Sequence, residues 1–319
     1  MRRTLPFGCL LLAGCNHHQS AVAPFGREAN ETLTLTMVLV AGAIIVALVT
    51  AALYVRAVRA REGSLDHRGG MRLVLWMGAI VPTVLLTVLL LFALPAMRPM
   101  ETGPEDLVIR VEGEQFWWRV AYRPPGEEPL LSANEIRVPT GRRVHLVLAA
   151  GDVIHSFWIP GLAGKMDMIP GRDNDLVVEA EKPGRYRGVC AEFCGLSHAL
   201  MAFEVVAMEP EAFDAWLLAQ RGASTGASEG RGAALFTQNG CGACHAVRGT
   251  AHDAAIGPDL SRFGARTSLG AGILEPTRAN IAAFIRDPQG AKPGARMPAY
   301  KTMSEADAKA IAAYLKGLQ

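Results

Sequence analysis

Two short segments of this 319-residue chain hold side chains that bind metals and cofactors. In the first, CAEFCGLSHALM over 190–201, two cysteines, a histidine and a methionine lie close together: Cys190, Cys194, His198 and Met201. Thiolates and thioethers favour soft metals such as copper, and imidazole suits copper or zinc. This segment therefore predicts a metal site that is rich in sulfur ligands.

A second histidine can reach the same site. His155, in DVIHSFWIP, lies at the end of another expected strand, and a folded sandwich can bring it to Cys190. Together with a backbone carbonyl, these donors are enough for two copper ions bridged by both sulfurs. Three alternatives use the same residues, namely a Cys190–Cys194 disulfide, a Cys₂His₂ zinc site, and a core role for Met201 at the start of a strand. The spacing alone leaves these alternatives open.

The second segment, CGACH over 241–245, is the C-x-x-C-H motif of covalent c-type haem attachment. Cys241 and Cys244 are expected to form thioethers with the haem vinyl groups, and His245 is expected to be the proximal iron ligand. A redox C-x-x-C pair is the alternative, but the adjacent histidine and the strand-poor surroundings do not fit a thioredoxin-like unit. Met297, in GARMPAY, is the candidate for the sixth ligand, because a thioether axial ligand raises the reduction potential.

The elements that must position these residues follow two different patterns. Short runs rich in β-branched and aromatic residues predict a small β-sandwich or barrel, and they are LVIRVE, QFWWRVAY, EIRVP, RVHLVLAA, DLVVEA and RYRGVC. A Gly/Ser/Ala-rich stretch over 221–230 is typical of a flexible linker. Beyond it, NIAAFIRDP and EADAKAIAAYLKGL have helical spacing, and Ser304 is the candidate N-cap of the last helix.

Two long apolar runs, Leu33–Val58 and Leu73–Met97, each exceed the roughly 20 residues that a helix needs to cross the hydrocarbon core. The segment between them is rich in arginine, and positively charged loops stay in the cytoplasm. Both termini and everything after Met97 are therefore expected on the external face. A buried pair of helices in a soluble protein is the alternative.

The first residues are typical of an export signal. Arg2 and Arg3 precede a short apolar core, Leu5–Leu12, which is too short to span a bilayer. LAGC over 12–15 resembles the bacterial lipoprotein signal, in which the cysteine, here Cys15, is acylated; an ordinary signal peptide or a chance cysteine is the alternative. The predicted organisation is a signal peptide, an exported segment, a transmembrane hairpin, a β-sandwich domain, a linker and a helical domain, over 1–14, 15–32, 33–97, 98–220, 221–230 and 231–319.

Composition limits the classes of function. The formal net charge is only +2, whereas a nucleic-acid-binding domain is normally strongly basic. The six cysteines fall into three groups, and two of these groups have ligand-like spacing. The chain is therefore expected to bind metal and membrane but no nucleic acid.

DVIHSFWIPGLAGKMDMIPGRDND followed by CAEFCGLSHALM, behind a two-span hairpin, resembles subunit II of the haem–copper cytochrome c oxidases. The resemblance covers residues 33 to about 220 and implies a cupredoxin fold with a dinuclear CuA centre. It also implies that the carboxylate of Glu192 binds a magnesium ion at the interface with subunit I. The implied copper ligands are the bridging thiolates of Cys190 and Cys194, one histidine for each copper from His155 and His198, Met201, and the backbone carbonyl of Glu192.

The C-terminal part resembles class I cytochromes c, in which Pro258 of GPDL packs near the ligand histidine and Met297 is the axial ligand. A CuA subunit fused to an all-α cytochrome c domain resembles the caa3-type oxidases. This implies that electrons pass from an external donor through haem c and CuA to subunit I, where oxygen is reduced to water with proton pumping. The implied partners are subunits I and III and a donor such as a cytochrome c or a quinol–cytochrome c reductase, at a bacterial cell membrane.

Three other functions would use parts of this pattern. A copper-delivery protein has little use for a fused haem. An N₂O-reductase-like enzyme needs a second, histidine-rich copper cluster, which eight histidines do not supply. The subunit II of a quinol oxidase would normally have lost the copper ligands, which are all present here.

Two departures from the family pattern stand out. GEQFWW over 113–118 replaces the common GHQWYW, so Phe116 stands where a tryptophan is linked to electron uptake, and Trp117 and Trp118 are the other candidates. Packing inside the sandwich is expected to account for at least one of these aromatic residues. Many relatives also carry a glutamate three positions before a tryptophan in the second span, where this chain has Leu73 before Trp76. No carboxylate of this chain is therefore expected at the proton entrance.

Overall fold

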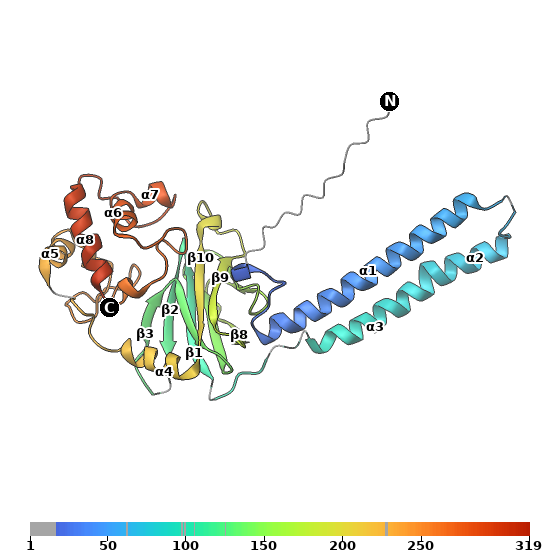
Figure 1. Cartoon of the computed structure of the whole chain (residues 1–319), viewed down its shortest axis with the longest axis horizontal. Coiled ribbons are helices and arrows are strands. Elements are labelled where there is room, and N and C mark those ends of the chain that lie inside the picture. The colour runs from blue at the N-terminus through green and yellow to red at the C-terminus, as the bar shows by residue number, and fades with distance from the viewer. Residues whose placement is uncertain are drawn as a thin grey trace, which may run out of the picture.

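The computed structural model describes residues 17–61, 63–96, 98, 100–104, 106–124, 126–226 and 229–319. Along the chain, a long helical hairpin is followed by a β-sandwich and then by a small helical domain, which lies on the side of the sandwich away from the hairpin (Figure 1). The predicted fold class is confirmed. The expected signal peptide and Cys15 lie outside the described residues.

The hairpin consists of α1 (Arg27–Arg59) and a second arm formed by α2 (His67–Leu75) and α3 (Val81–Ala96). A π-helical turn, Trp76–Ile80, joins α2 to α3 just before Pro82. Proline cannot donate a backbone hydrogen bond and its ring crowds the preceding turn, which the wider π turn relieves. The most apolar windows of both arms are wholly exposed in the protein, so lipid is the environment that suits them.

The hairpin is attached to the sandwich at the start of α1. Phe25 is buried there, and its backbone N–H donates to the Gly161 carbonyl at 2.8 Å. Gly26 comes so close to Leu162 that an added Cβ would lie 2.5 Å from the Leu162 carbonyl oxygen. The first span is therefore fixed to the domain that carries the sulfur-rich segment.

The sandwich contains two five-stranded sheets. One has the order β3-β2-β1-β5-β8, with the strands Leu130–Ala133, Trp117–Arg123, Leu107–Glu114, Arg143–Ala150 and Asn174–Glu179. The other has the order β4-β10-β9-β6-β7, with the strands Glu135–Pro139, Ala202–Met208, Gly184–Cys190, His155–Trp158 and Met166–Met168. Pairing is parallel between β1 and β5 and between β4 and β10, and antiparallel elsewhere among the described strands.

Alternation explains why these segments pack as two layers. In β1 the side chains of Leu107, Ile109 and Val111 are buried, while those between them are partly exposed. This is the period-two pattern of a strand with one face on the core. The six predicted strand segments are confirmed. The seven-residue strand β10 was not among these predicted segments, nor were β3 and β7, which are too short to show any alternation in sequence.

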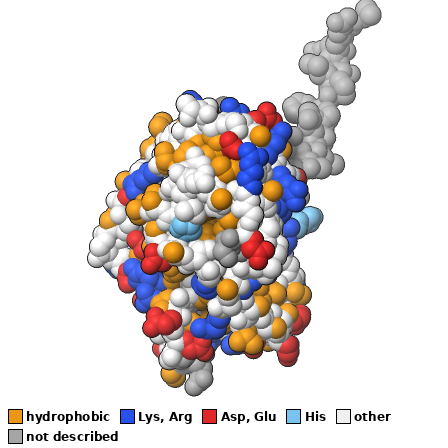
Figure 2. All heavy atoms as spheres, turned by 90° about the vertical axis from the view of Figure 1, so that its left-hand side faces the viewer, with side chains coloured by type: hydrophobic (Ala, Val, Ile, Leu, Met, Phe, Trp, Pro, Cys, Tyr) orange, Lys and Arg blue, Asp and Glu red, His pale blue; other side chains and the backbone are white. Residues whose placement is uncertain are grey.

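The C-terminal domain is built from α5 (Gly230–Gln238), α6 (Arg278–Arg286), α7 (Pro288–Ala291) and α8 (Glu305–Gly317). The predicted cap is confirmed, because the Ser304 side chain accepts from the Asp307 backbone N–H at 3.0 Å. Between the two domains, α4 (Pro210–Ala219) closes one end of the sandwich with buried Phe213. Seen end-on, the C-terminal domain mixes hydrophobic side chains with charges of both signs (Figure 2).

The C-terminal domain is docked on the sandwich and on the linker. Arg187 of β9 donates to the Gly272 carbonyl at 2.9 Å, and the Thr267 hydroxyl donates to the Glu135 carboxylate at 2.8 Å. In the described part of the linker, the Ser224 backbone N–H donates to the Arg248 carbonyl at 3.0 Å. The first two bonds hold the C-terminal domain on the sandwich, and the third holds the first half of the linker against the domain that follows it.

Candidate copper and haem centres

The sulfur-rich segment folds into a loop between β9 and β10 that turns its donors inward. Cys190 ends β9, and its Sγ lies 3.8 Å from the Sγ of Cys194. The Cys194 Sγ lies 3.7 Å from His198 Nδ1 and 3.8 Å from Met201 Sδ. The Glu192 carbonyl oxygen lies 3.2 Å from the Cys190 Sγ. The two cysteine sulfurs, a histidine nitrogen, a methionine sulfur and a backbone carbonyl therefore lie together in a single loop.

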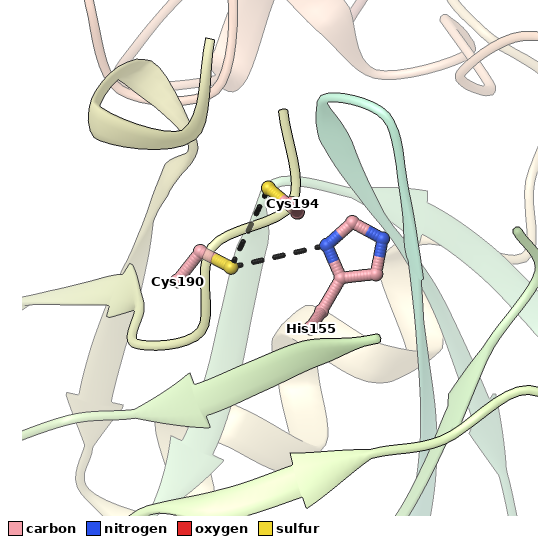
Figure 3. A group of neighbouring side chains, drawn as sticks. All are labelled: His155, Cys190 and Cys194. Atoms are coloured by element: carbon pink, nitrogen blue, oxygen red, sulfur yellow. Dashed lines mark hydrogen bonds between the residues drawn. The ribbon is translucent and has the colours of Figure 1, made fainter. Parts of the chain in front are cut away.

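The distant histidine completes this cluster. His155 opens β6, which pairs with β9 so that Phe157 lies opposite Cys190. The fully buried imidazole turns Nδ1 toward the Cys190 Sγ at 3.8 Å (Figure 3). Donor atoms of His155, Cys190 and Cys194 all lie within 4.8 Å of one another. The sheet thus brings the candidate ligands together across 35 positions of sequence.

The second nitrogen of this histidine has its own partner. His155 Nε2 lies 2.9 Å from Asp152 Oδ1, so Nε2 carries the proton that it donates and Nδ1 keeps its lone pair for the cluster. Burial alone would lower the pKa of His155, but its contacts with Cys190 and Asp152 outweigh burial and raise it. Asp152 was not predicted as part of the site, although it stands only three positions before the histidine.

The pKa values of the two thiols are shifted in opposite directions. Hydrogen bonding from Cys194, with help from His155, lowers the pKa of Cys190 to about 3 despite burial. The hydrogen bond with Cys190, followed by burial and then by the negative charge on Cys190, raises the pKa of Cys194. The pocket therefore forms one thiolate readily and disfavours a second. A bound cation supplies the positive charge that a second thiolate needs.

This donor set fits a copper pair better than a disulfide or a zinc site. The sulfurs are 3.8 Å apart and unbonded, well beyond the roughly 2.05 Å of a disulfide. A structural zinc ion takes four ligands, which two cysteines and two histidines already provide. Such an ion would leave Met201 Sδ and the Glu192 carbonyl beside the sulfurs without a metal to bind. Soft thioether and thiolate donors together are typical of copper.

The C-x-x-C-H motif lies at a cavity of about 410 Å³. Cys241 begins a 3₁₀ turn, and Cys244, His245 and Met297 line the cavity. His245 Nδ1 lies 2.7 Å from the Pro258 carbonyl, which accepts its proton and leaves Nε2 free for a metal. Burial lowers the pKa of His245, so the imidazole is neutral as a ligand must be.

Two cationic side chains line the same cavity, and they indicate that the ligand it binds is an anion. Lys292 is 3% exposed and donates to the Gly270 carbonyl at 2.7 Å, and Arg266 donates to the Asp259 carbonyl. Burial lowers the pKa of Lys292 to about 7 and also lowers the pKa of Arg266. The Gly270 carbonyl does not neutralise the charge of Lys292, whereas a ligand with carboxylate groups does. Haem, with its two propionates, meets this requirement.

The sandwich forms one wall of the haem cavity. Phe116 and Trp117 line it, and Arg119 stacks over the Trp117 ring at 4.8 Å while donating to the Ala255 carbonyl at 2.7 Å. Trp118 points the other way, is fully buried, and packs at 4.9 Å from the Phe203 ring in the core. Of the three aromatic candidates for electron uptake, two therefore face the haem cavity and one lies inside the sandwich.

A cupredoxin-like sandwich with a cytochrome c domain fused after it defines an electron-transfer class of protein. The family model described as the periplasmic domain of cytochrome c oxidase subunit II matches residues 123–208, and the model described as cytochrome c matches residues 230–319. Cytochrome c oxidase subunit 2 of Alkalihalophilus pseudofirmus is 36% identical over 99% of this chain and 96% of its own length. The subunit 2 of Bacillus subtilis is 32% identical over 97% and 95% of the two chains.

The chain belongs to the cytochrome c oxidase subunit 2 family. Among solved structures, the periplasmic domain of subunit II of cytochrome oxidase from Bradyrhizobium japonicum is 30% identical, covering 38% of this chain and 97% of that one with a TM-score of 0.35. The protein is therefore a subunit of an oxidoreductase complex with an electron-transfer role in a terminal oxidase. Its domains imply copper and haem, association with other oxidase subunits, and a membrane protein with an external domain.

Proposed function

We propose that this chain is the electron-accepting subunit of a caa3-type terminal oxidase. In this proposal, electrons pass from an external donor through covalent haem c and CuA to subunit I, where oxygen is reduced to water with proton pumping. The observation that carries the proposal is the convergence of five sulfur and nitrogen donors in a chain that also holds a C-x-x-C-H motif at a cavity of about 410 Å³. When bound, the copper pair and haem each take up and release one electron at a time.

Each residue of the copper cluster has a defined task. Cys190 and Cys194 would bridge the two ions, His155 and His198 would bind one ion each, and the two coordination shells would be completed by Met201 and the Glu192 carbonyl. All but Glu192 and His198 are buried, which keeps water out and limits rearrangement when the charge changes. The Glu192 carboxylate is left free for the magnesium ion expected at the subunit I interface.

In the haem domain, Cys241 and Cys244 would form the thioether links, with His245 and Met297 as axial ligands. The Pro258 carbonyl fixes the His245 ring, and Lys292 would neutralise a propionate. Phe116 and Trp117 line the cavity from the sandwich side and are the residues through which electrons would leave toward the copper cluster.

The chain would lie in a membrane beside other oxidase subunits. The hairpin would hold both domains on the external, periplasmic face of a bacterial membrane, with subunits I and III as neighbours. A cytochrome c or a quinol–cytochrome c reductase would be the external donor. Cys15, which lies outside the described residues, would carry a lipid anchor.

Electron paramagnetic resonance of the detergent-solubilised full chain tests the copper assignment. The oxidised protein is expected to give a mixed-valence signal with hyperfine splitting from two equivalent coppers, together with low-spin haem. His155→Asn should remove this signal while haem content is retained. His145→Asn is the matched control, because His145 lies on β5 and pairs with Asp175 at 2.7 Å, outside the cluster. A single-copper signal, zinc or a copper-free disulfide in the wild type would exclude the proposal.

A further inference from the structure

A side chain of the haem domain contacts the residue that supports a candidate copper ligand. Arg296, the residue before Met297, donates to Asp152 Oδ2 at 2.9 Å. The other oxygen of this carboxylate, Oδ1, accepts from His155 Nε2 at 2.9 Å. A continuous chain of polar contacts therefore leads from the candidate haem ligand loop to a candidate copper ligand.

The same loop also supports the second histidine. Ser197, directly before His198, is fully buried and donates its hydroxyl to the Pro293 carbonyl at 2.6 Å. Pro293 and Arg296 belong to one short loop of the haem domain. The docked loop is thus seated on the segments that hold both histidines.

Asp152 is well placed to transmit charge between the two domains. Its side chain is 12% exposed and also accepts from the backbone N–H groups of Gln115 and Val153, both at 2.8 Å. A carboxylate behind a metal-binding histidine makes the imidazole a stronger donor. Among these four donors to Asp152, Arg296 alone comes from the haem domain and alone carries a permanent positive charge.

We propose that Arg296 is a positioning residue that raises the reduction potential of the copper pair when the haem domain is docked. The inference rests on the copper assignment proposed above. Reduction adds one electron to the pair and changes no covalent bond or proton, so the effect is electrostatic. A cation paired with Asp152 weakens the donation by His155 and disfavours the more positive, oxidised pair. By linkage, docking favours copper reduction and copper reduction favours docking to the same extent.

Redox titration of the full chain in detergent, followed through the copper absorption, tests this proposal. At a fixed mediator potential, Arg296→Gln is expected to lower the ratio of reduced to oxidised copper pair about fivefold, the upper range for a partly exposed ion pair. Fivefold corresponds to about 40 mV, since tenfold is about 59 mV for one electron. Arg296→Lys keeps the charge and should restore at least half of the shift.

Arg231→Gln is the matched control. It removes the same charge from the same domain, but Arg231 pairs with Asp307 of α8. An unchanged copper potential in Arg296→Gln, or an equal shift in Arg231→Gln, overturns the proposal. A wild-type chain without the two-copper signal overturns both this proposal and the copper assignment. A wild-type signal combined with an unshifted Arg296→Gln variant overturns this inference alone.

Discussion

The copper cluster and the haem cavity differ in where their walls come from. Every donor of the copper cluster belongs to the sandwich, and neighbouring donors lie 3.2–3.8 Å apart in a buried site. The haem cavity takes its candidate ligands from the C-terminal domain but part of its wall, Phe116 and Trp117, from the sandwich. One centre is complete within its own domain, and the other is closed only by docking.

The largest expected effect is that a substitution in one centre removes its own cofactor and leaves the other cofactor in place. Cys194→Ser replaces a sulfur that lies within 3.8 Å of three other donors, and a neutral hydroxyl is a poor ligand for copper. Copper affinity should fall by more than the roughly 10–100-fold that loss of an outer partner costs. Copper and haem per chain, measured after purification, check the result.

Cys241→Ser is the reciprocal variant. It should remove one haem thioether and leave the copper content at the wild-type level, because Cys241 has no part in the sandwich. If Cys194→Ser also strips the haem, or Cys241→Ser also strips the copper, the two centres are not independent and the comparison fails.

The candidate copper ligands can be found in the sequence more readily than the residues that support them. Cys190, Cys194, His198 and Met201 are identifiable because a short loop fixes their spacing. Asp152 and Arg296 cannot be identified from the sequence, because their contact joins segments separated by 144 positions. This contact also depends on how the two domains dock. Metal-binding residue types in a fixed pattern are visible locally, whereas a charge pair between domains has no local signature.

The adjacent residues Trp117 and Trp118 also show that the sequence reveals a residue type but not its surroundings in the fold. Adjacent side chains of a strand point to opposite faces, so Trp117 and Trp118 cannot share one role. Alternation predicts that one is buried, but not which face receives the haem domain. Similarly, Lys292 and Arg266 are ordinary cations in the sequence, and only the folded cavity buries them.

The two methionines of the haem domain, Met297 and Met303, separate haem ligation from packing. Met303 is 9% exposed in the core of the haem domain, so Met303→Ala should lower its free energy of unfolding by about 2 kcal/mol. The haem spectrum should stay unchanged. Met297→Ala should abolish the charge-transfer band of methionine-ligated haem and lower the haem potential. Absorption spectra and denaturant unfolding of the two variants check both expectations; a lost band in Met303→Ala would reverse the assignment.

The smallest effect concerns pH and tests the proposal that a haem propionate is the anionic partner of Lys292. Burial lowers the pKa of Lys292 to about 7, below its ordinary value of about 10.4. Between these values the unfolded chain binds a proton that the folded, haem-free chain does not. Stability must therefore rise with pH across this window, by at most about 1.4 kcal/mol per pH unit. Hydrogen exchange in α6 and α8, corrected for its intrinsic pH dependence, measures this rise.

Lys292→Met should flatten the pH dependence, because the variant has no proton to lose. Haem binding should flatten it as well, since a propionate beside Lys292 restores the charged form in the folded state. If the haem-free wild type and Lys292→Met show equal slopes, the lysine is not held in a low-pKa state. If haem leaves the slope unchanged, the anion that Lys292 needs is not a haem propionate.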